Sequence, residues 1–251
     1  MEVEKTAGTG WQILNRDAIK YIAMLTMLLN HIAHIFLERG TPLYEIFEDI
    51  GFFTAPVMCY FLVEGYTYTR SKREYGLRLL LFAVISQVPF YLAFGYQSLN
   101  MMYTLFCCFL ILVVMERVDN PFLSKGLSLL LILVTVPGDW PMIAPILTIL
   151  LANDWGDRRG MARDYCLTYL LFAVLNVQSY LNGEPGNWIL YAVIHTLLSG
   201  LGILAAAVAV LFLYNGERAK RGRAFSKWFF YVFYPAHLIV LYLIKIDLHN
   251  I

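Results

Sequence analysis

Residues 18–37 read AIKYIAMLTMLLNHIAHIFL, a stretch that contains one lysine and no carboxylate. A helix needs about 20 predominantly apolar residues to cross the hydrocarbon core of a bilayer. The stretch therefore predicts a transmembrane helix. It also carries an amide and two imidazoles, at Asn30, His31 and His34. Polar groups of this kind are costly inside a membrane, so they become the first candidates for a functional site.

The whole chain has the composition of a membrane protein. Hydrophobic residues make up 59% of its 251 residues, and charged residues only 15%, against about 25% in soluble proteins. Its mean hydropathy is +0.61. A soluble domain of this length could not cover so much apolar surface, and a disordered chain would be far more polar.

Eight further apolar blocks follow the first one. Nine spans of roughly 20 residues leave only short loops, so we predict an all-α polytopic transmembrane helix bundle. It would form a single membrane-embedded domain over residues 1–251, with residues 1–17 as a cytoplasmic tail that lacks the apolar region of a signal peptide. The short fifth and sixth blocks could instead form a tight hairpin that does not fully cross. The later blocks are 50–68, 77–94, 100–116, 123–137, 140–153, 165–181, 188–213 and 228–246.

Basic residues predict the orientation, because Lys and Arg are enriched in short cytoplasmic loops. With nine spans and a cytoplasmic N-terminus, only Arg39 and Lys245 fall outside. The C-terminus is then outside. The remaining basic residues fall inside: Lys5, Arg16, Lys20, Arg70, Lys72, Arg73, Arg78, Arg117, Lys125, Arg158, Arg159, Arg163, Arg218, Lys220, Arg221, Arg223 and Lys227.

Several function classes receive no support. The four cysteines, Cys59, Cys107, Cys108 and Cys166, lack zinc-ligand spacing with histidines, so we predict no metal. A net charge of +1 gives no sign of nucleic-acid binding. No internal repeat is evident, which leaves a transporter built from two similar halves without support.

Asn30, His31 and His34 lie on one face of the predicted first helix, because residues three and four apart are neighbours. Histidine titrates near neutral pH, so the cluster could transfer protons. Two alternatives stay open. The imidazoles could be two ligands of a metal whose other ligands are not evident, or they could form hydrogen bonds between helices.

Glu64 lies in the cytoplasmic half of the second span, where a carboxyl must be neutral, paired or solvated. Tyr68, Arg70, Arg73 and Arg78 follow it. This basic and hydroxyl-rich mouth could bind phosphates through charge-assisted hydrogen bonds. It could also be only the charged flank that ends a span.

Two more candidates come later in the chain. Asp139 stands at a turn between prolines, where it could polarise a histidine or receive an ammonium group. Near the C-terminus, Tyr234-Pro235-Ala236-His237 interrupts an aromatic run. A mid-membrane proline frees a backbone carbonyl and allows a kink, so His237 could line a wet or ligand-filled site. The aromatic run alone is typical of packing.

Three segments together resemble the TraX family of bacterial inner-membrane proteins, over about residues 15 to 245. They are KYIAMLTMLLNHI at 20–32, APVMCYFLVEGY at 55–66, which Thr69-Arg70 follows, and FYVFYPAHL at 230–238. The resemblance implies acetyl transfer, since the family's founding member acetylates the N-terminal amine of conjugative pilin. TraX-like sequences often have Asp-His where this chain has Asn30-His31, and an amide can orient an imidazole but cannot support its charge.

The resemblance thus implies a bacterial inner-membrane acyltransferase that moves an acetyl group from cytoplasmic acetyl-CoA to a peptide or pilin amine or to a glycan. The expected partners are the acyl-CoA, this acceptor and the lipid bilayer, without nucleic acid. The rival functions are a proton-coupled transporter of a small solute or lipid-linked substrate, and a scaffold for pilus or secretion machinery. The catalytic candidates are His31, as general base, with Asn30, His34, Asp139 and His237, and the donor-binding candidates are Glu64, Tyr68, Arg70, Arg73, Arg78 and Tyr234.

Overall fold

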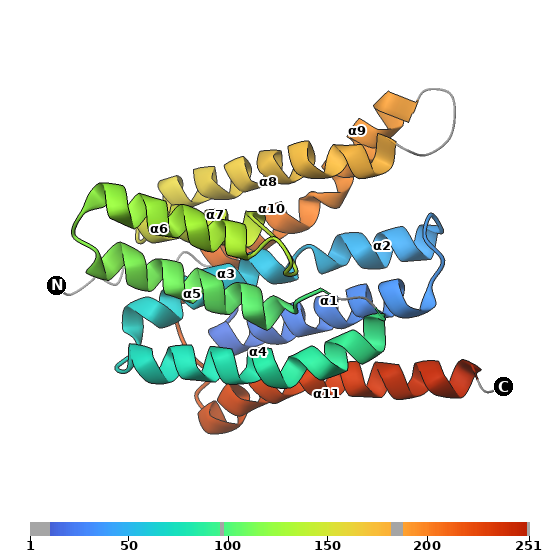
Figure 1. Ribbon diagram of the computed structural model, residues 1–251, viewed down its shortest axis with the longest axis horizontal. Helices are drawn as coiled ribbons and strands as arrows, with labels where there is room; N and C mark the ends of the chain where they lie inside the picture. Colours follow the sequence, from blue (N-terminus) through green and yellow to red (C-terminus); the bar gives the residue numbers. More distant parts are fainter. Residues whose placement is uncertain (1–10, 96–97, 182–187, 250–251) are drawn as a thin grey trace.

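The computed structural model describes residues 11–95, 98–181 and 188–249, which form helices joined by turns. Figure 1 shows most of these helices running along the long axis of the molecule. Their bounds are α1 (Arg16–Phe36), α2 (Pro42–Gly51), α3 (Thr54–Tyr68), α4 (Lys72–Phe94), α5 (Met101–Arg117), α6 (Pro121–Val134), α7 (Ile143–Asn153), α8 (Arg158–Leu181), α9 (Trp188–Ser199), α10 (Leu201–Val208), the π-helical turn η1 (Ala209–Leu213) and α11 (Arg223–His249).

The prediction of an all-α membrane bundle is confirmed in its coarse form. Each of the nine predicted blocks coincides with helix, and among the described residues five segments are long and apolar enough to cross a membrane. The chain is therefore a multi-pass membrane protein. The count of nine crossings, the single domain and the orientation stay predictions. The five segments are Arg16–Phe36, Pro42–Tyr68, Lys72–Phe94, Ala192–Leu213 and Trp228–Leu248.

Two predicted spans differ in detail from the helices that form. The block at 50–68 is the second part of a longer segment, which begins at Pro42 and breaks between α2 and α3. The block at 188–213 is interrupted at Gly200. Hydropathy alone misses these features, because charged residues in α2 lower its apolar content and a break leaves hydropathy unchanged.

Capping side chains fix where several helices begin. Asn15, Ser71, Asn100 and Asn120 precede α1, α4, α5 and α6, and each accepts a hydrogen bond from a backbone N–H in the first turn. Such caps satisfy donors that a helix start leaves without partners. Gly95 ends α4 in the left-handed conformation, with φ of 75°.

Three short helices cover only one half of the bundle. Figure 1 shows α5, α6 and α7 beside the half in which α4 begins, so the α6–α7 turn lies near the middle of the long axis. The 14 residues of α6 rise about 21 Å. That is less than the roughly 30 Å of a hydrocarbon core. The other half is built mainly by α2 and the ends of α1, α4, α8 and α11.

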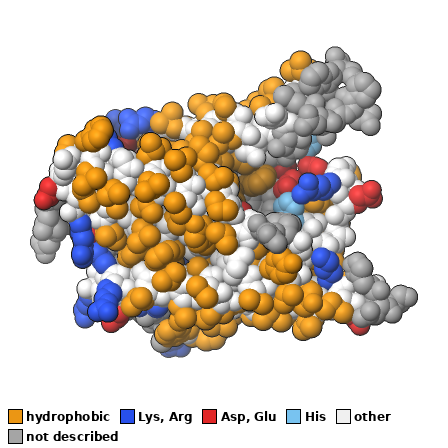
Figure 2. All heavy atoms as spheres, in the orientation of Figure 1, with side chains coloured by type: hydrophobic (Ala, Val, Ile, Leu, Met, Phe, Trp, Pro, Cys, Tyr) orange, Lys and Arg blue, Asp and Glu red, His pale blue; other side chains and the backbone are white. Residues whose placement is uncertain are grey.

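Apolar side chains cover the outer flank, while most of the visible Lys and Arg side chains gather at the end where α4 begins and α5 ends (Figure 2). Large hydrophobic residues such as Leu81, Leu130 and Leu170 are exposed, as expected where lipid replaces water. We refer to this end as the basic end. It coincides with the side that the sequence predicts to be cytoplasmic.

Candidate functional site

The first and last helices meet through two buried histidines. His31 of α1 and His237 of α11 place Nδ1 and Nε2 only 2.7 Å apart. Their rings stack with centroids 5.0 Å apart and an interplanar angle of 16°. Both residues are buried, at 5% and 6% exposure. The predicted catalytic residues from opposite ends of the chain are thus brought into direct contact.

The backbone determines which nitrogens carry protons when both rings are neutral. His237 Nδ1 lies 2.8 Å from the carbonyl oxygen of Phe233, which can only accept a hydrogen bond. Nδ1 is therefore the protonated nitrogen of His237, and its Nε2 accepts a hydrogen bond from Nδ1–H of His31. The lone pair of His31 consequently resides on Nε2, which is the atom suited to act as a base.

Aromatic rings surround this histidine pair. Phe94 lies edge-on to His31 with centroids 5.1 Å apart, and Phe233 stacks on His237 at 4.9 Å. Tyr234 contacts both imidazoles edge-on, and its hydroxyl accepts a hydrogen bond of 3.2 Å from the backbone N–H of Met101. Tyr234 therefore ties the start of α5 to the pair. The sequence analysis predicted that Tyr234 would bind the acyl donor, acetyl-CoA.

His34 lies on α1, one turn beyond His31. It contacts a separate group of polar side chains, which belong to α2. The Tyr44 hydroxyl lies 3.0 Å from His34 Nδ1 and 3.1 Å from Glu48 Oε1. Glu48 Oε1 also lies 3.5 Å from His34 Nε2. In Figure 2, acidic, basic and histidine side chains gather in this half of the bundle, between apolar surfaces. His34 is thus positioned by α2 through Tyr44 and Glu48.

Asn30 contacts α2 instead of supporting the imidazole of His31. Its Nδ2 donates a 3.3 Å hydrogen bond to the backbone carbonyl of Glu48. A Cβ added to Gly51 would lie 2.4 Å from Asn30 Cβ, so only glycine permits this approach of α2 to α1. Asn30 therefore acts as a contact between helices, which was one of the alternatives for this cluster.

Asp139 occupies the α6–α7 turn and joins it to the start of α5 through its backbone. Its N–H donates to the Leu99 carbonyl at 2.9 Å, and its carbonyl accepts from the Thr104 hydroxyl at 2.6 Å. Within the described ranges, its carboxylate makes no hydrogen bond or ion pair with a histidine. The structure does not bring Asp139 together with the imidazoles as expected.

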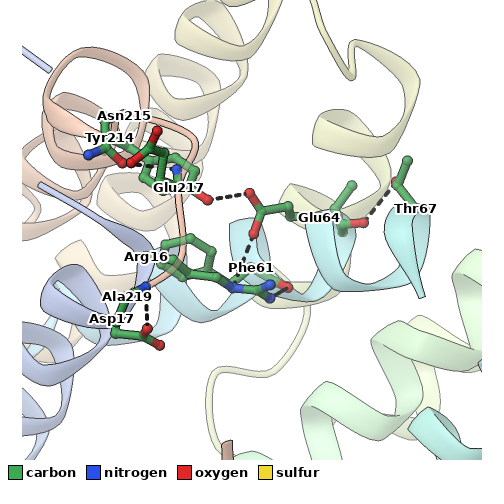
Figure 3. Close-up of polar contacts among 10 residues, drawn as sticks. Arg16, Asp17, Phe61, Glu64, Thr67, Tyr214, Asn215, Glu217 and Ala219 are labelled. Carbon is green, nitrogen blue, oxygen red and sulfur yellow. Dashed lines mark hydrogen bonds and ion pairs between the residues drawn. The ribbon is translucent and has the colours of Figure 1, made fainter. Parts of the chain in front are cut away.

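Glu64 forms a buried ion pair near the basic end. Its Oε2 lies 3.1 Å from Arg16 Nε, and its Oε1 accepts a 2.7 Å hydrogen bond from the Tyr214 hydroxyl. Figure 3 shows Glu64 between these two partners. Backbone hydrogen bonds hold them there, because residues just before α1 pair with 213–217, as in Leu14 N–H to the Leu213 carbonyl at 2.9 Å. Glu64 is thus paired with an arginine, which is one of the three states that the sequence allowed for a carboxyl at this depth.

The basic mouth divides into exposed and inner parts. Tyr68, Arg70 and Arg73 are exposed. Arg78 instead turns inward, with its guanidinium carbon 5.8 Å from the centroid of Tyr75. Its Nε is buried and has no hydrogen-bond partner in the part of the chain that the structure describes. Of these four residues, only Arg78 belongs to the same inner region as Glu64.

Several residues of these groups escaped the sequence analysis. Arg16 and Tyr214 hold Glu64, while Tyr44 and Glu48 hold His34. Tyr44 and Glu48 are four residues apart, which places them on one helical face. The charged residues of α2, however, keep hydropathy from identifying it as part of a transmembrane segment. The sequence also did not predict the partner of His195. The Nδ1 atom of His195 lies 3.7 Å from Glu45 Oε2 on α2.

The described residues contain no group of three or more His, Cys, Asp or Glu side chains arranged to hold a metal ion. The four cysteines are free, and only Cys166 is exposed.

Comparisons with known proteins place the chain among membrane proteins of one family. The model of the TraX protein family matches residues 15–245. A protein of Dichelobacter nodosus, named "Probable fimbrial assembly protein FimC, serogroup H1", is 31% identical over 237 residues, which covers 89% of this chain and 92% of that protein. No solved structure matches the chain.

Proposed function

Because the chain belongs to the TraX family, we propose that it is an integral membrane acyltransferase, which moves an acetyl group from acetyl-CoA to an amine. The observation that supports this most is the contact between His31 and His237, which leaves a lone pair on Nε2 of His31. A positioned imidazole base is what acyl transfer to an amine or hydroxyl requires. It would act in the bacterial cytoplasmic membrane, with the basic end in the cytoplasm.

The proposed reaction uses the pair as a base. The neutral amine of the acceptor attacks the thioester carbonyl carbon, so that a C–N bond forms and the C–S bond breaks. His31 Nε2 takes the proton that the amine loses and passes it to the departing thiolate, which becomes the free thiol. His237 accepts the hydrogen bond from Nδ1–H and stabilises the positive charge that develops on His31.

His34 supplies a second proton-handling group one helical turn away. It is linked to Glu48 directly and through Tyr44. A proton can pass between an imidazole and a carboxylate that lies this close. We assign to this group the removal of the proton that a protonated acceptor amine loses before it attacks, and the release of that proton toward the outer half of the bundle, with Asn30 holding α2 in place.

The proposed acceptor is the amine of a fimbrial or pilin subunit, with a sugar as the alternative. The similarity to a protein named for fimbrial assembly supports a peptide acceptor. The acidic side chains of α2, which include Glu45, Glu48 and Asp49, give the outer half a charge that attracts cationic amines.

Acetyl transfer in proteoliposomes tests the proposal. The purified protein would receive labelled acetyl-CoA on one side and peptides with the N-terminal sequences of fimbrial subunits on the other. We expect labelled peptide with wild-type protein, and a loss of at least about 100-fold with His31→Ala. His195→Ala is the matched control, since it removes another partly buried histidine, whose Nδ1 lies 3.7 Å from Glu45 Oε2.

Two outcomes would reject the proposal. One is transfer that survives intact in His31→Ala. The other is the absence of transfer to any peptide or sugar acceptor by a well-folded protein that instead moves protons when a solute is added. The second result would identify the chain as a proton-coupled transporter.

A further inference from the structure

Three basic side chains lie near the basic end of the bundle. Arg16 and Lys20 come from α1, and Arg78 comes from α4. The Arg16 guanidinium carbon and the Lys20 Nζ each lie 5.4 Å from the ring centroid of Phe61. Two cations therefore approach the same aromatic ring. The Arg78 guanidinium carbon lies 5.8 Å from the ring centroid of Tyr75, and the Tyr75 hydroxyl packs against Gly65, the neighbour of Glu64, which places Arg78 near the Arg16–Glu64 pair.

The carboxylates nearby do not balance this inner group. Glu64 pairs with Arg16 at 3.1 Å, and both side chains are almost buried. Arg78 has only Glu74, at 3.7 Å, and the side chain of Glu74 is 72% exposed. Such an exposed pair contributes little. Lys20 forms no ion pair with a carboxylate among residues 11–95, 98–181 and 188–249, and the Asp17 carboxylate accepts a hydrogen bond from the backbone of Ala219.

Aromatic rings replace the missing counter-ions. The Lys20 Nζ lies 5.0 Å from the centroid of Phe230 as well as near Phe61. Cation–π contacts of this kind stabilise a cation by less than the removal of an ion from water costs. The buried Nε of Arg78, which has no hydrogen-bond partner within the described residues, is a further unsatisfied donor. An anion bound between these side chains would satisfy all three cations.

We propose that Arg16, Lys20 and Arg78 form a binding site for the phosphate groups of a nucleotide. Guanidinium groups bind phosphate through paired hydrogen bonds, while an ammonium acts as a compact point charge. The ring of Phe230, which is partly exposed, offers a flat face on which a base can stack. The ion pair with Glu64 holds Arg16 toward this region while leaving Lys20 and Arg78 available.

The identity of the nucleotide rests on the proposed function. Acetyl-CoA carries an adenosine 3′,5′-bisphosphate unit at the end opposite its thioester. The inner cations would bind this unit, so the exposed Arg70 and Arg73 would not be the main contacts for the donor. A phospholipid headgroup presents the same phosphate chemistry, so the test must separate the two sources.

Calorimetry on the full-length protein in neutral detergent would use adenosine 3′,5′-bisphosphate as the probe. It contains the phosphates and the base but neither thioester nor acyl group. We expect saturable binding that weakens about tenfold in Lys20→Met and in Arg78→Gln, the effect of losing one charged hydrogen-bonding contact. Lys125→Met and Arg117→Gln are the matched controls, because both residues are exposed. Arg117 ends α5 and Lys125 lies near the start of α6, and these two helix ends lie at the basic end of the bundle (Figure 1). Each should change the affinity by less than about twofold.

A second arm repeats the titration in nanodiscs of phosphatidylcholine, with and without phosphatidylglycerol. Undiminished nucleotide binding in the presence of the anionic lipid is expected. Loss of nucleotide binding there would assign the cations to a lipid headgroup and overturn the inference. Equal affinities of wild type, Lys20→Met and Arg78→Gln would also overturn it, provided that all three unfold at similar temperatures.

Different experimental results would reject this inference and the proposed function. If acetyl transfer occurs while Lys20→Met leaves the KM for acetyl-CoA unchanged, the nucleotide site is wrong and the acyltransferase stands. If the bisphosphate binds with the expected pattern of variants but no acyl group is transferred, the site stands and the reaction does not.

Discussion

His31 Nδ1 and His237 Nε2 lie 2.7 Å apart although the two residues are separated by 206 positions in the sequence. The contact joins α1 to α11, so the pair forms only when these two helices have packed together. The carbonyl of Phe233 then fixes the tautomer of His237 and, through it, that of His31.

The acceptor role of His237 can be separated from its size. In His237→Gln the side-chain amide oxygen can still accept a hydrogen bond from His31, whereas His237→Ala removes the acceptor. We expect kcat to fall by about 100-fold or more in His237→Ala and by a smaller factor in His237→Gln. The KM for acetyl-CoA should change little in either variant. Equal losses of kcat in the two variants would contradict the role of Nε2 as an acceptor.

Replacement of Asn30 by the aspartate that TraX-like sequences often carry is expected to harm this chain. Asn30 donates a hydrogen bond to the Glu48 carbonyl, and a carboxylate cannot donate. Asn30→Asp should therefore destabilise the protein by about 1–3 kcal/mol, without a gain in transfer rate. Thermal unfolding in detergent and a transfer assay would measure both. A more active and equally stable variant would show that residue 30 acts on His31.

The ion pair between Arg16 and Glu64 should contribute to stability in a way that depends on both partners. Removal of one partner of a buried pair costs about 3–5 kcal/mol, and the slight exposure of these side chains, 13% and 11%, places the expected loss for Glu64→Leu at the lower end. The double variant Arg16→Met/Glu64→Leu should be more stable than Glu64→Leu alone, because no unpaired charge remains. Unfolding free energies of the two single variants and the double variant give the coupling, and additive losses would contradict it.

Gly202 allows α10 to approach the break between α2 and α3. A Cβ at this position would lie 2.8 Å from the backbone nitrogen of Phe53 and 2.9 Å from the carbonyl oxygen of Asp49. Neither backbone atom can move freely, so Gly202→Ala should cost about 1–3 kcal/mol. Gly126→Ala is the control, since open space surrounds that position. It should be neutral or stabilise α6 by about 0.5–1 kcal/mol, and a stable Gly202→Ala variant would show that the helices can separate there.

Hydropathy predicts the helices well, because lipid imposes apolar side chains on every exposed face. The family also follows from local motifs, which include His31 and His237. The contacts that the candidate site residues make in the folded protein do not follow from local motifs. Glu64 and Arg16 are 48 positions apart, and α2 brings Tyr44 and Glu48 to His34 only because the chain turns back after α1. Such contacts depend on which helices become neighbours, and one sequence does not encode that choice in a local pattern.

The short helices beside the α6–α7 turn affect the lipid as well as the protein. Where a hydrophobic segment is too short for the bilayer, the lipid thins locally at a cost of fractions of a kcal/mol per Å. With its rise of about 21 Å, α6 leaves roughly 9 Å of hydrocarbon unmatched on this flank. The lipid leaflet beside α2 is therefore expected to thin locally, so that its surface approaches Asp139. A substrate anchored in that leaflet could reach the interior of the bundle sideways, without leaving the membrane.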